Sequence, residues 1–155
     1  MADHNVPGDV PDDLVETYLD NLMAATCGTG SMNLFACDQK IEHLNDDFYD
    51  GGVKIPLSSN DPGHLFEIGA RAHEEGTVGV LAAQGGLISH YAQDHPDVPY
   101  LVKLNSKSHL VNTDQRDPIS LAMWDMDDVM SLVSDGINVV GIGYTIYIGS
   151  EYEHE

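Results

Sequence analysis

Residues able to do proton-transfer or phosphate chemistry follow an apolar run near the start of the chain. Residues 34–37 are apolar, and an acid, a base and an imidazole come directly after them, namely Asp38, Lys40 and His43. A carboxylate can move protons, and a lysine can bind a phosphate or attack a carbonyl. The alternative is a polar turn at the end of a buried strand. Both interpretations place this segment at a strand end.

Polar residues also follow the three other apolar runs of the chain. These residues are Gln84, Gly85 and Gly86, then Lys103, Asn105 and Lys107, and finally Tyr144, Thr145 and Ser150. Half of the six basic residues lie in these segments or after the first run. In a chain with so few basic residues, this placement predicts an anionic ligand, most simply a phosphorylated small molecule.

Lys103 lies between Val102 and Leu104, at the end of an apolar run. One interpretation is a catalytic lysine that forms a Schiff base, transfers a proton or holds a substrate oxygen. The other is a structural lysine paired with Asp38 or Glu42. The residues alone leave both open.

A divalent metal site is a weaker hypothesis. His43, His90 and His109 follow three successive apolar runs, but no two histidines have the close spacing of a metal motif. We therefore expect no metal and no other cofactor. Cys37 precedes Asp38 and could act as a thiolate nucleophile, but a cysteine within an apolar run is more often a small core residue.

The charge balance limits the partners. The chain has 155 residues, with 26 Asp and Glu against 6 Lys and Arg, and a formal net charge of −20. Such a surface repels nucleic acids and anionic membranes, so we expect neither as a partner. Adaptation to high salt explains the acidic surface better than recruitment of a basic partner, because lysine is scarce throughout the chain. No basic-then-apolar leader segment or long apolar span is present, which predicts a cytoplasmic protein.

The elements that would position these residues alternate between strands and helices. Continuously apolar runs predict strands covered on both faces, at 32–37, 77–83, 99–104 and 137–143. Helices are predicted between them and before the first one, with Asp61 and Asp125 as N-caps and Gly76 and Gly136 as stops. This order predicts an α/β fold with a parallel sheet, whose sites form at the carboxyl ends of the strands.

Two details of the helices are expected from the pattern. Asp12 or Asp13 is expected to cap a helix that runs to about residue 25. In the last helix the apolar residues are expected to face inward, namely Val129, Met130, Leu132 and Val133.

Four segments together resemble one enzyme family. "ACDQKIEHLND", "LAAQGGLISHYAQ", "PYLVKLNSKSHL" and "GIGYTIYIGSEYE" occur in the order found in the archaeal-type class I fructose-bisphosphate aldolases. The resemblance runs from about residue 30 to residue 153. It implies a (β/α)8 barrel that cleaves fructose 1,6-bisphosphate to dihydroxyacetone phosphate and glyceraldehyde 3-phosphate through a lysine Schiff base, without a metal.

The resemblance also implies roles for individual residues. Asp38 matches the acid of the first barrel strand, and Lys103 matches a site lysine of the third, so both are expected to be catalytic. Lys40 departs from the small residue that many members have in the "DHGIEH"-like motif. Substrate contacts are expected from Lys40, His43, Gln84, Asn105, Lys107 and Tyr144. The Schiff-base lysine of the sixth strand and the proton-shuttling tyrosine of the fifth have no counterpart here.

We therefore expect an N-terminal arm and helix at 1–29 and half of a TIM barrel at 30–155, holding strands one to four and truncated before strands five to eight. The expected activity is that of a class I aldolase on a phosphorylated sugar, with the isolated chain inactive and the full-length form a homo-oligomer. The alternatives are a sister aldolase or transaldolase of archaeal aromatic amino-acid synthesis, a non-catalytic half-barrel, and pairing of two copies into eight strands.

Overall fold

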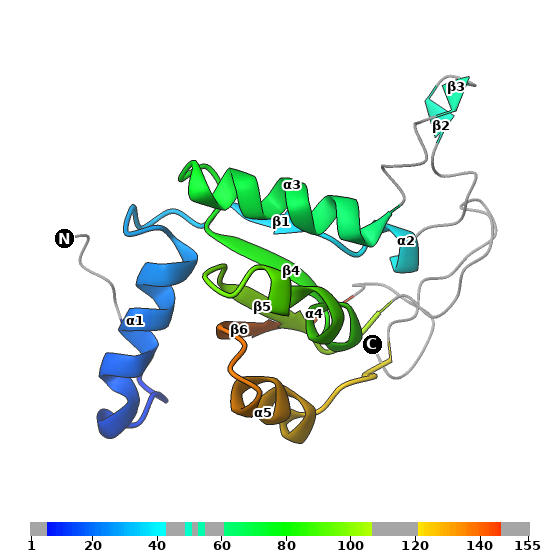
Figure 1. Ribbon diagram of the computed structural model, residues 1–155. Helices are drawn as coiled ribbons and strands as arrows, with labels where there is room; N and C mark the ends of the chain where they lie inside the picture. Colours follow the sequence, from blue (N-terminus) through cyan, green and yellow to red (C-terminus); the bar gives the residue numbers. More distant parts are fainter. Residues whose placement is uncertain (1–5, 43–48, 51–52, 55–60, 107–120, 147–155) are drawn as a thin grey trace.

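The structure is a computed structural model that describes residues 6–42, 49–50, 53–54, 61–106 and 121–146. Its centre is a four-stranded sheet (Figure 1) formed by β1 (Leu34–Ala36), β4 (Val80–Gln84), β5 (Tyr100–Lys103) and β6 (Val139–Gly143). The spatial order is β1-β4-β5-β6, and all three neighbouring pairs are parallel. The predicted parallel sheet of β/α units is therefore confirmed, with strands slightly shorter than expected.

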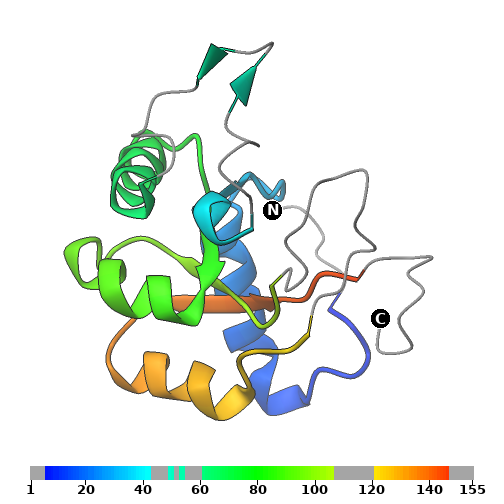
Figure 2. The same cartoon turned by 90° about the vertical axis from the view of Figure 1, so that its right-hand side faces the viewer.

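Helices connect the strands and cover one face of the sheet. They are α3 (Pro62–Glu74), α4 (Gly85–Tyr91), followed by the 3-10 turn η4 (Ala92–Asp94), and α5 (Met126–Ser134). Figure 2 shows α3, α4 and α5 following one another along this face. Helices on one face of a curved parallel sheet are the arrangement of a barrel wall, in which the other face lines the interior.

The predicted helix signals are present at α3 and α5. The side chain of Asp61 accepts a hydrogen bond from the backbone N–H of Gly63, and Pro62 occupies the first turn, where its missing N–H costs nothing. Asp125 and Asp128 form a reciprocal capping box at the start of α5. Gly76 and Gly136, which follow the two helices, have φ values of 72° and 83°, which favour glycine.

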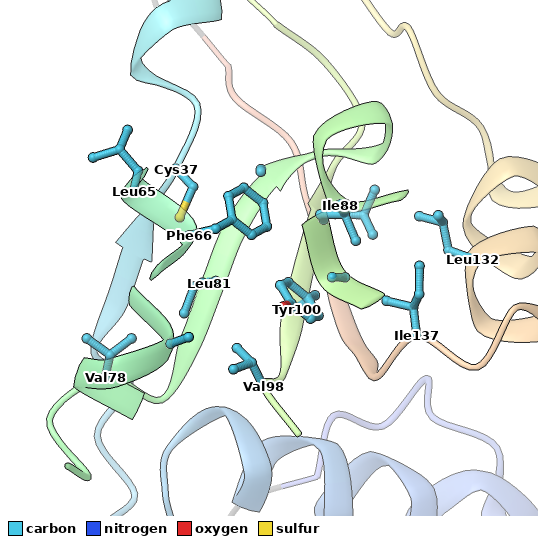
Figure 3. Packing of buried hydrophobic residues seen from close by; sticks show 14 of the residues in the cluster. Cys37, Leu65, Phe66, Val78, Leu81, Ile88, Val98, Tyr100, Leu132 and Ile137 are labelled. Atoms are coloured by element: carbon cyan, nitrogen blue, oxygen red, sulfur yellow. The ribbon is translucent and has the colours of Figure 1, made fainter. Parts of the chain in front are cut away.

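The hydrophobic core lies between the sheet and these helices (Figure 3). Phe66 of α3 is fully buried, and its ring centroid lies 5.1 Å from that of Tyr91 and 6.1 Å from that of Tyr100. Leu81 and Val102 contribute from the two central strands. Successive strand residues point to opposite faces, so the residues next to these apolar side chains point away from the helices.

The N-terminal helix packs at the amino ends of the strands (Figure 1). The 3-10 turn η1 (Asp12–Leu14) leads into α1 (Val15–Ala25), which Figure 1 shows beside the amino ends of the strands. An apolar pocket of about 200 Å³ separates α1 from the inner sheet face, lined among others by Tyr18, Leu101 and Ile142. No helix in the described part of the chain is long and apolar enough to cross a membrane.

Several sequence expectations are wrong in detail. Neither Asp12 nor Asp13 caps a helix, because both lie within η1 and its preceding residue is Pro11. Met130 and Val133 are exposed, since α5 contacts the core only through the stripe that holds Val129 and Leu132.

Exposure on the inner face also differs from the expectation of fully covered strands. Only β4 is buried throughout, whereas β1, β5 and β6 are partly exposed. Three short elements carried too little pattern to be predicted: α2 (Gln39–Glu42), and the hairpin of β2 (Tyr49–Asp50) and β3 (Val53–Lys54).

The contact between α1 and β4 requires glycine at position 79. A Cβ added to Gly79 would overlap the backbone carbonyl of Ala25. We expect Gly79→Ala to lower the free energy of unfolding by roughly 1–3 kcal/mol, because backbone atoms must move apart. Gly141→Ala is the matched control, since its Cβ would meet nothing within 4 Å. Urea unfolding in molar KCl measures both variants, and equal midpoints would contradict this packing.

Candidate active site

The sheet register brings three polar residues to one level on the inner face. Gln84 is paired with Lys103 in the β4–β5 ladder. Ala36 is paired with Ala82 in the β1–β4 ladder, so Asp38, two residues further on, lies level with Gln84. Leu81 and its neighbours on the alternate positions face the helices, so this polar level faces the interior. Asp38, Gln84 and Lys103 thus meet at the carboxyl ends of adjacent strands.

Asp38 and Lys103 form an ion pair in which Asp38 is buried and Lys103 is partly buried. The Nζ of Lys103 donates to Oδ2 of Asp38, and the two side chains are 18% and 6% exposed, respectively. β4 lies between β1 and β5 in the sheet. The ion pair therefore spans two strand spacings, which place β1 and β5 roughly 9–10 Å apart. The long lysine side chain crosses that gap. The structural interpretation of Lys103 as a partner of Asp38 is confirmed, and it is compatible with a role at the substrate.

Gln84 lies beneath this ion pair. Its Nε2 donates to Oδ2 of Asp38 at 3.1 Å and to Oγ of Ser106 at 3.3 Å. Gln84 and Ser106 are each 2% exposed. The four residues form one polar cluster, which we call the rim cluster: Asp38, Gln84, Lys103 and Ser106.

Asn105 holds the end of β6 next to the rim cluster. It is fully buried, its Nδ2 donates to the carbonyl of Thr145 at 2.7 Å, and its Oδ1 accepts from the N–H of Thr145 at 2.9 Å. The amide group thus replaces one ladder pair beyond the last residues of the sheet. Tyr144, which precedes Thr145, is exposed. A contact of Asn105 with substrate stays a prediction, while its amide positions Thr145 in this structure.

Trp124 covers the start of α4. The indole ring lies so close to Gly85 that a Cβ there would come within 2.8 Å of it. The backbone N–H groups of Met123 and Trp124 donate to the carbonyl of Leu104 at 2.8 and 3.1 Å, which ties this segment to the end of β5. Trp124 was not among the residues expected at the site. Ser106 was expected at this edge, because it is one of the polar residues that follow β5, three positions after Lys103.

The arrangement can stabilise negative charge and accept a proton. Asp38 provides a carboxylate at the rim, and Lys103 provides a positive charge beside it. A hydroxyl group that reaches this carboxylate would lie within range of both groups, which suits proton transfer from a substrate alcohol. The cluster lies at the carboxyl ends of the strands, where barrel enzymes bind their substrates.

The remaining predicted residues have different outcomes. Lys40 belongs to α2, but its side chain lies outside the described residues, as do His43, Lys107, His109 and Ser150. His90 is exposed on α4. Among the described residues, no group of three or more His, Cys, Asp or Glu side chains could hold a metal ion.

Cys37 is a core residue in this structure. It is fully buried, and burial, with a smaller contribution from Asp38, raises the pKa of its thiol to about 12. A thiol that stays protonated is a poor nucleophile. The core interpretation is therefore confirmed for the folded protein.

The two cysteines should react very differently. Cys27 is exposed and Cys37 is buried, and both are free. At pH 8 we expect Ellman's reagent to modify one thiol per folded chain, with the second reacting only after denaturation. Peptide mapping of an iodoacetamide-treated sample would identify the first as Cys27. Rapid modification of Cys37 in the folded chain would contradict its burial.

The ion pair should appear as a coupling energy. Lys103→Met removes the lysine from the buried Asp38 carboxylate, and Asp38→Asn removes that carboxylate charge from beside the Lys103 ammonium. We expect the double variant to be more stable than the sum of the two single effects, with a coupling of about 1–3 kcal/mol. Urea unfolding of all four proteins measures it. Strict additivity would show that the pair contributes nothing.

Comparisons with known proteins give the family. Residues 32–155 match the DeoC/LacD family aldolases. The chain is 48% identical over 153 residues to the fructose-bisphosphate aldolase/6-deoxy-5-ketofructose 1-phosphate synthase of Methanocaldococcus jannaschii, and the match covers 98% of this chain and 47% of that protein.

Two solved structures are similar as well. A fructose-bisphosphate aldolase from Slackia heliotrinireducens superposes with a TM-score of 0.83 at 54% identity, over 98% of this chain and 46% of that one. A Schiff-base-forming fructose-1,6-bisphosphate aldolase has a TM-score of 0.61 at 28% identity, over 88% of this chain and 47% of the other. The chain thus spans about half the length of these relatives. With its parallel β/α units and its rim of strand-end residues, it belongs to the DeoC/LacD family of aldolases.

Proposed function

We propose that this chain provides half of the active site of a Schiff-base aldolase that cleaves fructose 1,6-bisphosphate reversibly. The observation that carries the proposal is the Asp38–Lys103 ion pair at the carboxyl ends of the strands. A paired acid and base at that edge of an aldolase-family sheet have the chemistry that the reaction needs.

In the proposed reaction, a lysine amine first condenses with the C2 carbonyl of the substrate and releases water. Asp38 then accepts the proton of the C4 hydroxyl as the C3–C4 bond breaks. The electron pair of that bond moves toward the iminium nitrogen, which gives an enamine and releases glyceraldehyde 3-phosphate. Protonation at C3 and hydrolysis of the imine release dihydroxyacetone phosphate and restore the lysine.

Lys103 fits a supporting role in this scheme better than that of the imine lysine. Its ammonium is bound to Asp38, and an amine must be unprotonated to attack a carbonyl. We propose that Lys103 balances charge at the substrate oxygens, as the resemblance implies. The proposed substrate contacts stay Lys40, His43, Gln84, Asn105, Lys107 and Tyr144.

The names of the relatives support the substrate. The M. jannaschii protein and both solved structures are named as fructose-bisphosphate aldolases, so a transaldolase of aromatic amino-acid synthesis is not favoured. We further propose that the active protein works in the cytoplasm of a cell with high internal salt, as a homo-oligomer. The net charge of −20 supports the salt requirement.

The proposal is tested in a chimera in which this chain replaces the matching half of the M. jannaschii relative. We expect the chimera to cleave fructose 1,6-bisphosphate in molar KCl, with a rate that EDTA does not change. Asp38→Asn should lower kcat by about 10²–10⁴-fold, because the proton acceptor is lost.

Asp97→Asn is the matched control, because Asp97 is an exposed acid that precedes the amino end of β5, whereas Lys103 lies at the carboxyl end of that strand. It should leave kcat unchanged. A folded chimera without cleavage activity, or an Asp38→Asn variant at the full rate, would refute the proposed function.

A further inference from the structure

The side chain of Gln84 is a buried amide in the middle of a charged site. β4 is buried along its whole length, and Gln84 is its last residue. Burying an amide is unfavourable unless its polar atoms are hydrogen-bonded. Gln84 lies on the inner face, level with Asp38 and Lys103, which indicates that its amide acts on this ion pair.

The geometry identifies the orientation of this amide. A carboxylate only accepts hydrogen bonds, so the Gln84 atom that faces Asp38 must be the donor Nε2. The same nitrogen reaches Ser106, in the segment that follows β5. Gln84 therefore links β1 to the end of β5 from the strand that lies between them.

Gln84 and Lys103 both donate to the same oxygen of Asp38. Both hydrogen bonds end on Oδ2. Two donors from different strands that end on one oxygen hold the Asp38 side chain in a single χ1 rotamer, and the second oxygen, Oδ1, is the one to which neither of them donates. A proton acceptor held in one position supports a higher reaction rate than a mobile one, because it is aligned with the substrate more of the time.

We propose that Gln84 is a positioning residue, which holds the Asp38 side chain in one χ1 rotamer so that its carboxylate faces the substrate hydroxyl. This rests on the proposed aldol reaction for its catalytic consequence, whereas the positioning itself concerns only this chain. Lys103 balances the charge of the Asp38 carboxylate, and Gln84 orients the Asp38 side chain. A purely structural Gln84 would fill space under the ion pair and leave the Asp38 rotamer to Lys103.

The positioning is tested in the 155-residue chain by NMR. Three-bond couplings from the Asp38 carboxyl carbon to its own backbone nitrogen and carbonyl carbon report the χ1 rotamer. We expect one rotamer in the wild type and averaging between rotamers in Gln84→Met, which keeps the side-chain size and removes the donor. Gln39→Met is the matched control, because Nε2 of Gln39 donates to the carbonyl of Ala36 at 2.6 Å and not to Asp38. It should keep one rotamer.

A second variant protects the test against loss of folding. Gln84→Glu keeps the side-chain shape but places a carboxylate against that of Asp38, so the Asp38 rotamer should change there too. A single unchanged Asp38 rotamer in a folded Gln84 variant would overturn the proposal.

Kinetics in the chimera give the catalytic consequence. We expect Gln84→Met to lower kcat about tenfold with KM changed less than about twofold, because only the reacting geometry is lost. An unchanged kcat would overturn the catalytic part of the proposal. If the unsubstituted chimera were folded but inactive, the proposed function would fail, while the NMR result would still decide the role of Gln84.

Discussion

The ion pair of Asp38 and Lys103 constrains the rest of the structure. Removing a carboxylate and an ammonium from water costs several kcal/mol for each ion, and mutual attraction repays this only with close contact and further hydrogen bonds. The two residues come from strands that are not neighbours, so the chain must hold β1, β4 and β5 in a fixed register. A slip of one residue would turn either side chain toward the apolar helix face.

The remaining elements maintain this register. The core between the helices and the sheet contains Phe66, Leu81 and Tyr100. The alternate residues of the strands point to the opposite face, where the site lies. Asn105 extends the sheet beyond its last ladder pair by binding both backbone groups of Thr145. Gly79 lets β4 begin directly against the end of α1. Packing on one face therefore determines which residues meet on the other.

Much of this architecture was predictable from local patterns. Four continuously apolar runs predicted the strands, and side-chain caps and glycines predicted α3 and α5, because those signals act within a few residues. The placement of Asp38, Gln84 and Lys103 on one rim followed from the parallel order alone. The resemblance to aldolases implied catalytic roles for Asp38 and Lys103, which stay predictions, and the structure shows the two side chains in contact.

Other features depended on tertiary contacts that a single sequence does not contain. Met130 and Val133 are as apolar as their buried neighbours, yet only Val129 and Leu132 meet the core. The apolar pattern cannot show how wide a stripe the neighbouring elements cover. Likewise, the sequence placed Gln84 at the rim but not its amide beneath the ion pair, because that contact spans 46 residues. Trp124 lies in no motif and was found only from its contact with Gly85.

Reductive trapping tests the central claim most directly, namely that Lys103 is the ion-pair partner of Asp38 and not the imine lysine. The folded chain in molar KCl is incubated with dihydroxyacetone phosphate and borohydride, then analysed by intact mass and peptide mapping, beside the M. jannaschii aldolase as a positive control. We expect no adduct at Lys103 while the control is labelled. A stoichiometric adduct at Lys103 would contradict it.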